Sequence, residues 1–285
     1  MIVGRLAPTP SGHLHLGNVC AFGAAWLSVR ARGGELLLRI EDVDRERSRA
    51  DIAASQRDDL RWLGLHWDRE VPPQRDRDYR PWLERLEASG HLYWCTCTRK
   101  DLRATGGRYP GTCRNAGHRQ GALRFRLPDG PVTFHDRRFG PREVDPHQFG
   151  DPVLQRRDGR FAYNLAVVVD DLTDGVTEVV RGADLLDYTA VQLRLWEAFG
   201  ATPPSYLHAP LVTDADWKKL SKSHGATEVR SLRANGVTAE QIWRLVLPWL
   251  GVEADGLAAA SAQFDASRGP QGPIVLTNPG SPFPT

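Results

Sequence analysis

The stretch RLAPTPSGHLHLGN, residues 5–18, decides the fold because it joins a short apolar strand to a largely apolar helix. We expect the strand over residues 2–8 and the helix over 18–32, where two glycines end it. A second strand over 35–40 follows at once. A strand, a helix and a strand in about 40 residues form a βαβ unit, which implies a parallel sheet.

The same pattern continues on both sides of an irregular segment. Residues 95–120 are rich in Gly, Arg and Cys and weakly periodic, which is typical of a small insert held by something other than a core. From residue 266 the chain is rich in Pro and Gly, and we expect an irregular tail. We expect strands over 122–127, 131–136, 165–169, 176–180 and 207–212, and helices over 49–63, 76–89, 184–199, 227–234 and 238–249.

Charge is spread unevenly along the chain. The 285 residues carry a formal net charge of only +2, so the bulk charge does not indicate a nucleic-acid partner. Residues 99–126, however, hold eight Arg or Lys and one acid, Asp101, which is enough to attract a phosphate backbone. A solvated basic surface is the simpler alternative for such a stretch.

Targeting and membrane signals are weak. The first residues contain Arg5 and two prolines but no apolar signal-peptide core. The apolar run 165–169 is far too short to span a bilayer. Four cysteines, three of them clustered, argue against a disulfide framework. We therefore expect a cytoplasmic protein without a membrane partner.

Residues 12–18 are suited to binding an anion. Gly12 and Gly17 let a ligand approach the backbone closely, and the helix that begins near Asn18 directs free N–H groups and its positive dipole end at that position. His15 can donate hydrogen bonds to phosphate oxygens. The segment contains neither a P-loop nor a Gly-x-Gly-x-x-Gly fingerprint.

The segment KKLSKSHG, residues 218–225, is a second cationic element. Three lysines interleaved with two serines suit the charge that develops on a transferring phosphoryl group. Taken alone, the segment is equally compatible with a solvated surface loop. Its combination with residues 12–18, about 200 residues upstream, favours a shared role at a nucleotide.

Two signatures identify a family resemblance. The sequence HLGN, residues 15–18, resembles the HIGH signature of class I aminoacyl-tRNA synthetases, and KLSKS, residues 219–223, resembles their KMSKS signature. The glutamyl branch is indicated by RIEDVD at 39–44 and VRGADL at 180–185. Asn replaces the second His of the first signature and Leu replaces Met in the second, and neither change implies loss of activity. The resemblance covers residues 3 to 250.

The resemblance implies an α/β fold. The expected architecture is a Rossmann-type parallel-sheet catalytic domain with a small zinc-bearing insert and a short helical C-terminal region. The implied segments are 1–94 for the first half of the catalytic domain, 95–120 for the zinc-binding insert, 121–212 for an acceptor-end-like region and the second half, 213–265 for the lysine loop and a helical stem-contact region, and 266–285 for the irregular tail.

In this family ATP lies between the two signatures while the carboxylate of the amino acid attacks the α-phosphorus. Catalysis then needs positioning and charge stabilisation rather than a protein nucleophile. The resemblance assigns the catalytic phosphate contacts to His15, Lys219 and Lys222, with Lys222 as the main donor to the transition state. Mg²⁺ would accompany ATP. The implied ATP-binding set is His15, Gly17, Asn18, Lys219, Ser221 and Lys222.

Glutamate has two carboxylates and one ammonium group, so a selective pocket needs two cationic anchors and one acid. Arg5, Glu41 and Arg181 stand at expected strand ends, where open α/β sheets bind ligands. A guanidinium can bind a carboxylate through two hydrogen bonds, and glutamine cannot offer that charge. A lone strand-end Arg is also compatible with a surface salt bridge. The glutamate-binding set that the resemblance implies is Arg5, Leu6, Ala7, Pro8, Thr9, Glu41, Tyr163 and Arg181.

Cysteines in the irregular segment form the pattern Cys-x-Cys-x11-Tyr-x3-Cys. The thiolates of Cys95, Cys97 and Cys113 are suitable ligands for structural zinc, and reduced free cysteines are the alternative. Chemistry leaves the fourth ligand open, because His118 is a conventional ligand whereas a phenolate is unusual. The resemblance favours Tyr109, since glutamyl-Q enzymes carry a site of this spacing.

The resemblance implies an enzyme that adenylates L-glutamate with ATP and passes it to tRNA, acting as a monomer. About 60 residues follow Ser223, whereas discriminating glutamyl-tRNA synthetases carry a separate anticodon-binding region there. We therefore expect the glutamyl-Q branch, which activates glutamate without tRNA and transfers it to the queuosine base at the wobble position of tRNA(Asp). Alternatives are a compact glutamyl-tRNA synthetase that charges the 3′ end of tRNA(Glu), and a non-catalytic tRNA-binding paralogue.

Overall fold

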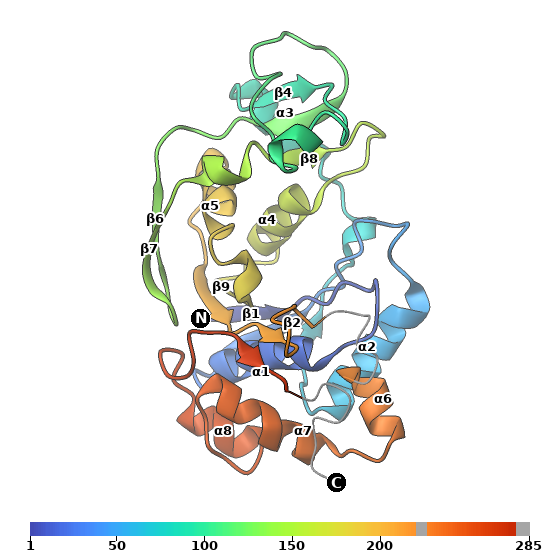
Figure 1. The fold of residues 1–285 in the computed structure, drawn as a ribbon, viewed down its shortest axis with the longest axis vertical. Helices are drawn as coiled ribbons and strands as arrows, with labels where there is room; N and C mark the ends of the chain where they lie inside the picture. Colours follow the sequence, from blue (N-terminus) through green and yellow to red (C-terminus); the bar gives the residue numbers. More distant parts are fainter. Residues whose placement is uncertain (221–226, 278–285) are drawn as a thin grey trace.

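A parallel sheet runs through the centre of the molecule (Figure 1). The computed structural model describes residues 1–220 and 227–277. Strand β1 pairs in parallel with β2, Arg5 lying opposite Leu37, and β2 pairs with β3. The expected βαβ unit is therefore confirmed. Its elements are β1 (Val3–Leu6), α1 (Leu16–Arg30), β2 (Glu35–Leu38) and the short β3 (Arg69–Glu70), with α2 (Ala50–Trp62) between the last two.

The second half of the sheet joins the first through β1 and β9. The backbone N–H of Val3 donates to Thr177 Oγ1 at 2.9 Å, and the N–H of Thr177 donates to the carbonyl of Val3 at 2.9 Å. The sheet β3-β2-β1 therefore meets the sheet β9-β10-β6-β7 at β1 and β9, and the direction of winding reverses between these two strands. Ligands of such sheets bind at the carboxyl ends of the strands flanking this point. The added strands are β9 (Glu178–Gly182), β10 (Ser205–Ala209), β6 (Val132–Asp136) and the antiparallel β7 (Gly140–Val144).

Helix α1 is buried between the sheet and the C-terminal helices (Figure 1). Its apolar residues face both layers, which explains why the helix is hydrophobic on every side. Gly23 gives the indole of Trp243 room to pack, since a Cβ at Gly23 would lie 2.8 Å from the Trp243 ring. Trp243 Nε1 also donates to the carbonyl of Leu63 at 2.8 Å. The C-terminal helices are α6 (Val229–Ala234), α7 (Ala239–Val246) and α8 (Leu257–Gln263).

Residues 165–169 were expected as a strand, and this prediction is wrong. They lie in helix α4 (Tyr163–Thr173), and all five are buried. A short run that is apolar at every position carries no period by which a helix can be told from a strand. The helix expected over 184–199 is likewise shorter: a 3₁₀ turn η4 (Ala183–Leu185) precedes α5 (Thr189–Ala198).

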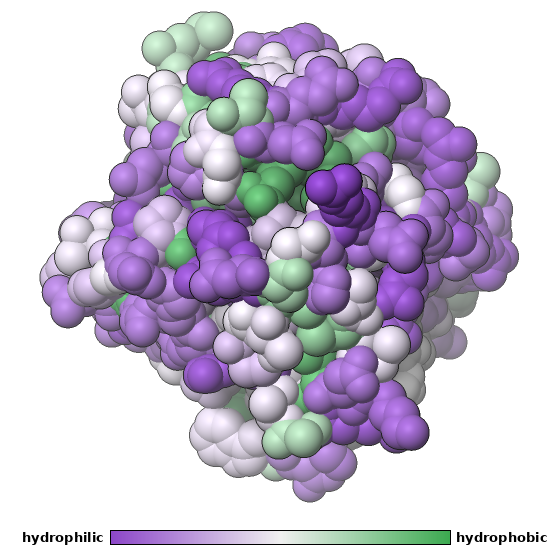
Figure 2. Space-filling model, turned by 90° about the horizontal axis from the view of Figure 1, so that it is seen from above, coloured by the Kyte–Doolittle hydropathy of each residue, from purple (hydrophilic) through white to green (hydrophobic). Residues whose placement is uncertain are grey.

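The irregular segment is inserted in a separate antiparallel sheet of β4, β5 and β8 (Figure 1). Cys95, the last residue of β4, pairs with Ala122 at the start of β5, so the two strands close the base of the insert. Figure 2 views the molecule from this end, and hydrophilic side chains dominate the face. The strands are β4 (Leu92–Cys95), β5 (Ala122–Phe125) and β8 (Val153–Gln155), and helix α3 (Arg80–Ala88) leads into β4.

The tail expected to be irregular contains a short strand. Strand β12 (Ile274–Val275) pairs in parallel with β11 (Val212–Thr213), which follows β10 after a break at Pro210. Leu276 N also donates to the carbonyl of Thr213 at 2.9 Å. Among the described residues, no helix has the length and apolar character needed to cross a bilayer.

Trp217 occupies an unfavourable backbone position in the turn after β11. Its φ is +63°, in the left-handed region, and its side chain is 68% exposed. We expect Trp217→Gly to be more stable than Trp217→Ala by about 1 kcal/mol, because only glycine adopts this conformation without a Cβ penalty. Urea unfolding of both variants measures the difference. Equal unfolding free energies would contradict a strained turn.

Candidate active site

A cavity of about 360 Å³ opens at the carboxyl ends of β1, β2 and β9. It lies where the strand order reverses, as expected for a sheet of this kind. Leu6 is fully buried beneath the cavity and does not line it. Gly17 lines a smaller adjoining cavity that shares several residues with the first. The predicted site residues that line the large cavity are Arg5, Ala7, Pro8, Thr9, His15, Asn18, Glu41, Tyr163, Arg181 and Lys219.

The imidazole of His15 forms the N-terminal cap of α1. His15 Nδ1 accepts from the N–H of Gly17 at 3.2 Å, and Asn18 Oδ1 accepts from the N–H of His15 at 3.0 Å. In the neutral ring this places the proton on Nε2, the form that donates to a phosphate oxygen. Asn18 uses its oxygen for the cap, so its amide N–H₂ group is the part suited to a nucleotide. The helix end thus presents donors, together with its dipole, to the cavity.

Lys219 reaches the same cavity from the strand-and-turn segment after β11. Its ammonium group forms an ion pair with Asp184, which follows β9, and both residues line the large and the small cavity. His15 and Lys219, although about 200 residues apart, therefore face one space. The predicted residues Ser221 and Lys222 lie outside the described residues.

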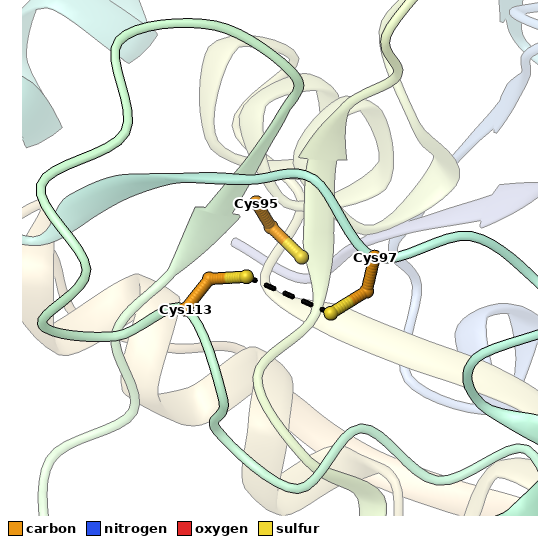
Figure 3. Close-up of side chains that lie close together, drawn as sticks. All are labelled: Cys95, Cys97 and Cys113. Carbon is orange, nitrogen blue, oxygen red and sulfur yellow. Dashed lines mark hydrogen bonds between the residues drawn. The ribbon is translucent and has the colours of Figure 1, made fainter.

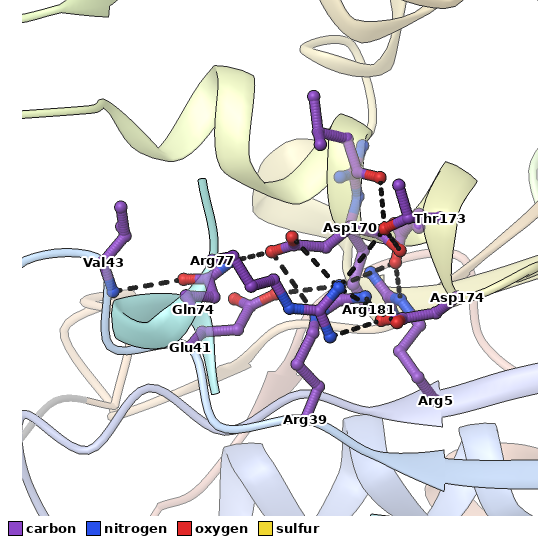
Figure 4. Close-up of polar contacts among 12 residues, drawn as sticks. Arg5, Arg39, Glu41, Val43, Gln74, Arg77, Asp170, Thr173, Asp174 and Arg181 are labelled. Atoms are coloured by element: carbon purple, nitrogen blue, oxygen red, sulfur yellow. Dashed lines mark hydrogen bonds and ion pairs between the residues drawn. The ribbon is translucent and has the colours of Figure 1, made fainter. Parts of the chain in front are cut away.

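Below the cavity, a fully buried guanidinium binds several carboxylates (Figure 4). Arg39 contacts Asp171 at 2.6 Å, Asp174 at 3.0 Å and Glu41 at 3.3 Å. The two aspartates belong to α4 and its C-cap, whereas Arg39 and Glu41 follow β2. The cluster therefore ties α4 to the carboxyl end of the first half of the sheet.

Arg5 extends from β1 toward α4 and β9. Its Nε donates to Asp171 Oδ1 at 3.1 Å and its Nη1 donates to the carbonyl of Val180 at 3.0 Å. Although burial favours the neutral acid, Arg5 and Arg39 hold the pKa of Asp171 below its usual value. Burial raises the pKa of Glu41, so an ammonium group from a ligand would favour its charged form.

Arg181, at the end of β9, differs from Arg5 and Arg39 in its partners. It is only 8% exposed, yet the acceptors that it contacts among the described residues are all uncharged. A buried guanidinium without a carboxylate partner is costly, and a ligand carboxylate would compensate this cost. The acceptors are His208 Nε2 at 3.1 Å, Gln192 Oε1 at 2.6 Å, Thr189 Oγ1 at 2.8 Å and the carbonyl of Leu185 at 3.4 Å.

The three cysteines of the insert converge (Figure 3). The sulfurs of Cys95, Cys97 and Cys113 all lie within 4.8 Å of one another, and those of Cys97 and Cys113 are 3.6 Å apart. Thiolates on a tetrahedral zinc with Zn–S bonds of about 2.3 Å lie roughly 3.8 Å apart. None of the three forms a disulfide. The donor set and its spacing fit a metal ion.

Both candidates for a fourth ligand lie near the cysteines. Tyr109 Oη accepts from the N–H of Cys113 at 2.7 Å, and Tyr109 is 4% exposed. His118 Nε2 lies 3.3 Å from Thr96 Oγ1, on the residue between Cys95 and Cys97. Tyr109 is thus buried among the cysteines, whereas His118 is exposed beside them.

The family model described as tRNA synthetases class I (E and Q), catalytic domain, matches residues 1–261. The chain belongs to this family. It is similar to a protein of Nitratidesulfovibrio vulgaris named Glutamyl-Q tRNA(Asp) synthetase, with 47% identity over 85% of this chain and 84% of the relative. A protein of the same name from Pseudomonas putida is 45% identical over 92% of this chain and 91% of the relative.

A solved structure shows that the class I catalytic fold extends over nearly the whole chain. A glutamate tRNA ligase from Elizabethkingia meningosepticum, crystallised in complex with its amino acid, superposes with a TM-score of 0.83 at 24% identity. The match covers 96% of this chain and 66% of the ligase. At this identity the likeness concerns the fold alone, and it agrees with the predicted parallel-sheet architecture.

Several residues of this class I site carry no signal in the sequence. Gln56 of α2 is 1% exposed, and its amide donates to the carbonyls of Thr9 and Gly12 at 3.1 and 2.7 Å, which fixes the first βα turn. Asp171 lies two residues after the apolar stretch 165–169 that was assigned to a strand. A buried glutamine on a helix of mixed polarity and an acid beside valines belong to no motif, so only the packing reveals them.

We expect Cys95→Ser to lower both the metal content and the thermal stability, because one thiolate of the cluster is lost from a fully buried position. Metal analysis and thermal unfolding of the zinc-loaded protein measure both quantities. Cys20→Ser is the matched control, since Cys20 is also buried but lies in α1, outside the cluster. It should lose stability without losing metal. Full stability of Cys95→Ser with no metal in the wild type would refute a metal site.

Proposed function

We propose that the protein activates L-glutamate with ATP and transfers it to the queuosine base at the wobble position of tRNA(Asp). The observation that carries the proposal is the cavity, in which the buried guanidinium of Arg181 lacks a carboxylate partner among the described residues and lies with Arg5, Glu41, His15 and Lys219. Relatives named Glutamyl-Q tRNA(Asp) synthetase, 43% to 47% identical, support the choice of acceptor.

Glutamate activation needs no protein nucleophile. An oxygen of the α-carboxylate attacks the α-phosphorus, and the bond from this phosphorus to the bridging oxygen breaks, so pyrophosphate leaves with the electron pair. His15 Nε2 and the ammonium of Lys219 stabilise the charge on the phosphates, and Lys222 is the main donor to the transition state in this proposal. Gly17, Asn18 and Ser221 complete the ATP contacts. Mg²⁺ would accompany ATP and would supply positive charge that screens the phosphates.

Glutamate is selected by complementary charges. Arg181 binds the side-chain carboxylate that distinguishes glutamate from glutamine, because a neutral amide would leave its buried charge uncompensated. Glu41 binds the ammonium group, which offsets the burial of its carboxylate. Arg5 contributes a second positive charge from β1. Ala7, Pro8, Thr9 and Tyr163 line the rest of the site, whereas Leu6 is buried in the core and does not line the cavity.

In the second step a nucleophile of the queuosine base attacks the activated carbonyl, and AMP leaves. We assign the insert a role in tRNA binding, because it carries most of the basic stretch 99–126. Cys95, Cys97 and Cys113, with Tyr109 as the preferred fourth ligand, would hold a structural zinc ion there. The reaction belongs in the cytoplasm, where ATP and tRNA are available.

Pyrophosphate exchange tests the activation step. Glutamate-dependent exchange between ATP and labelled pyrophosphate is expected without any tRNA. Exchange that strictly requires tRNA would favour a glutamyl-tRNA synthetase instead, and no exchange at high enzyme concentration would favour a non-catalytic tRNA-binding protein.

Transfer of labelled glutamate tests the acceptor. The label should enter tRNA(Asp) that carries queuosine and should not enter the same tRNA that lacks it. Labelling of tRNA(Glu) at its 3′ end would overturn the proposed acceptor while leaving glutamate activation intact.

Arg181→Gln should raise the KM for glutamate about 10- to 100-fold, because a charge-assisted hydrogen bond to a carboxylate contributes roughly 1.5–3 kcal/mol. The KM for ATP should change less than twofold. Steady-state pyrophosphate exchange measures both constants. Arg142→Gln is the control, since Arg142 pairs with Asp187 and does not line the cavity. Equal losses for glutamate and ATP would indicate that Arg181 is only structural.

A further inference from the structure

The guanidinium of Arg181 is held by an imidazole instead of a carboxylate. Arg181 Nε lies 3.1 Å from His208 Nε2, and His208 Nδ1 lies 2.7 Å from Asp136 Oδ2. Arginine remains protonated in proteins, so its Nε–H must donate and His208 Nε2 must accept. The proton of a neutral His208 is therefore on Nδ1 and is donated to Asp136. The two flanking groups thus determine the tautomer.

The chain of three side chains crosses three adjacent strands. Arg181 of β9 is directly opposite His208 of β10, and Asp136 ends β6, which pairs with β10. Asp136 and His208 are fully buried. Asp136 Oδ1 accepts from the N–H groups of Arg138 and Phe139, both at 2.9 Å, so its second oxygen is the one turned to His208. Burial lowers the pKa of His208, in agreement with a neutral ring.

Arg5 shows the alternative arrangement, in which a guanidinium binds a carboxylate of the protein without an imidazole between them. Arg5 Nε binds the carboxylate of Asp171 directly, so much of its charge is compensated inside the protein. For Arg181 the imidazole stands between the guanidinium and the acid. A neutral acceptor fixes the plane of the guanidinium yet leaves its charge for a ligand.

We propose that Asp136 and His208 are positioning residues that set the preference for glutamate by holding Arg181 in place without neutralising it. This inference rests on the proposed function, because it requires that Arg181 bind the side-chain carboxylate. His208 does not line the cavity, so it acts through Arg181 and not on the substrate itself.

Asp136→Asn tests the role of the tautomer with almost no change in shape. The single acceptor of the new amide is required by the backbone N–H groups of Arg138 and Phe139. Its N–H₂ group then faces His208 Nδ1, which moves the ring proton to Nε2, against the Nε–H of Arg181. We expect the KM for glutamate to rise at least tenfold, the preference over glutamine to fall, and the KM for ATP and kcat to change less than twofold.

The matched control is Asp145→Asn. Asp145 also accepts from a backbone N–H, that of His147 at 2.9 Å, and contacts its imidazole at 3.1 Å. This second Asp–His pair is exposed and does not line the cavity. All kinetic constants should remain at the wild-type value.

Substitutions of His208 separate positioning from simple core packing. His208→Gln can place an amide oxygen at the former Nε2 position and still accept from Arg181, whereas the shorter side chain of His208→Asn cannot reach it. We expect His208→Gln to keep a near-wild-type KM for glutamate and His208→Asn to lose at least tenfold. In the His208→Gln background, Asp136→Asn should have little further effect, because no ring proton can move.

The outcomes separate the two proposals. Thermal unfolding first establishes which variants fold. If Asp136→Asn does not fold, the comparison of His208→Gln with His208→Asn provides the test. Two results would overturn this inference alone, provided that the wild type is active. One is an unchanged KM for glutamate in folded Asp136→Asn. The other is an equal rise of this KM in His208→Gln and His208→Asn. A wild type without glutamate-dependent exchange would instead overturn the proposed function.

Discussion

The cavity depends on the ion pairs that the buried guanidinium of Arg39 forms with the surrounding carboxylates. Arg39 follows β2, and the carboxylates that surround it come from α4 and from Glu41. Removing either side of such a buried cluster would leave an uncompensated charge, at a cost of about 3–5 kcal/mol. Because Asp171 binds Arg39 and Arg5 together, the position of Arg5 in the cavity is set by the same contacts. Stability and site geometry are therefore linked.

The arginines at the carboxyl ends of the strands have different electrostatic states. Arg39 and Arg5 contact carboxylates of the protein, so much of their charge is compensated within the protein. Arg181 contacts only uncharged acceptors among the described residues. A bound anion would therefore stabilise its buried charge more than that of Arg5 or Arg39. A site with one uncompensated buried charge discriminates well against a neutral isostere of its ligand. The isostere cannot offset the free-energy cost of burying that charge.

Local features and those dictated by sheet topology can be predicted from the sequence. The first βα turn has its own signals, and the adjacency of Arg5, Glu41 and Arg181 arises because parallel strands end at one edge. The helix over 163–173 was missed because an apolar run fits either element. His208 and Asp136 were missed because their contact arises from cross-strand pairing between segments far apart in the chain. The contribution of Lys222 stays a prediction, since it lies outside the described residues.

The pairing of β12 with β11 gives the end of the described chain a mechanical role. Strand β11 leads directly into the turn that carries Lys219, and its hydrogen bonds with Ile274 and Leu276 anchor that turn at its base. Shortening the chain before Ile274 would leave Val212 and Thr213 as an open sheet edge. The turn that carries Lys219 would then be less well ordered, so more conformational entropy would be lost when it binds a nucleotide. Residues that do not contact a substrate can in this way affect the affinity for it.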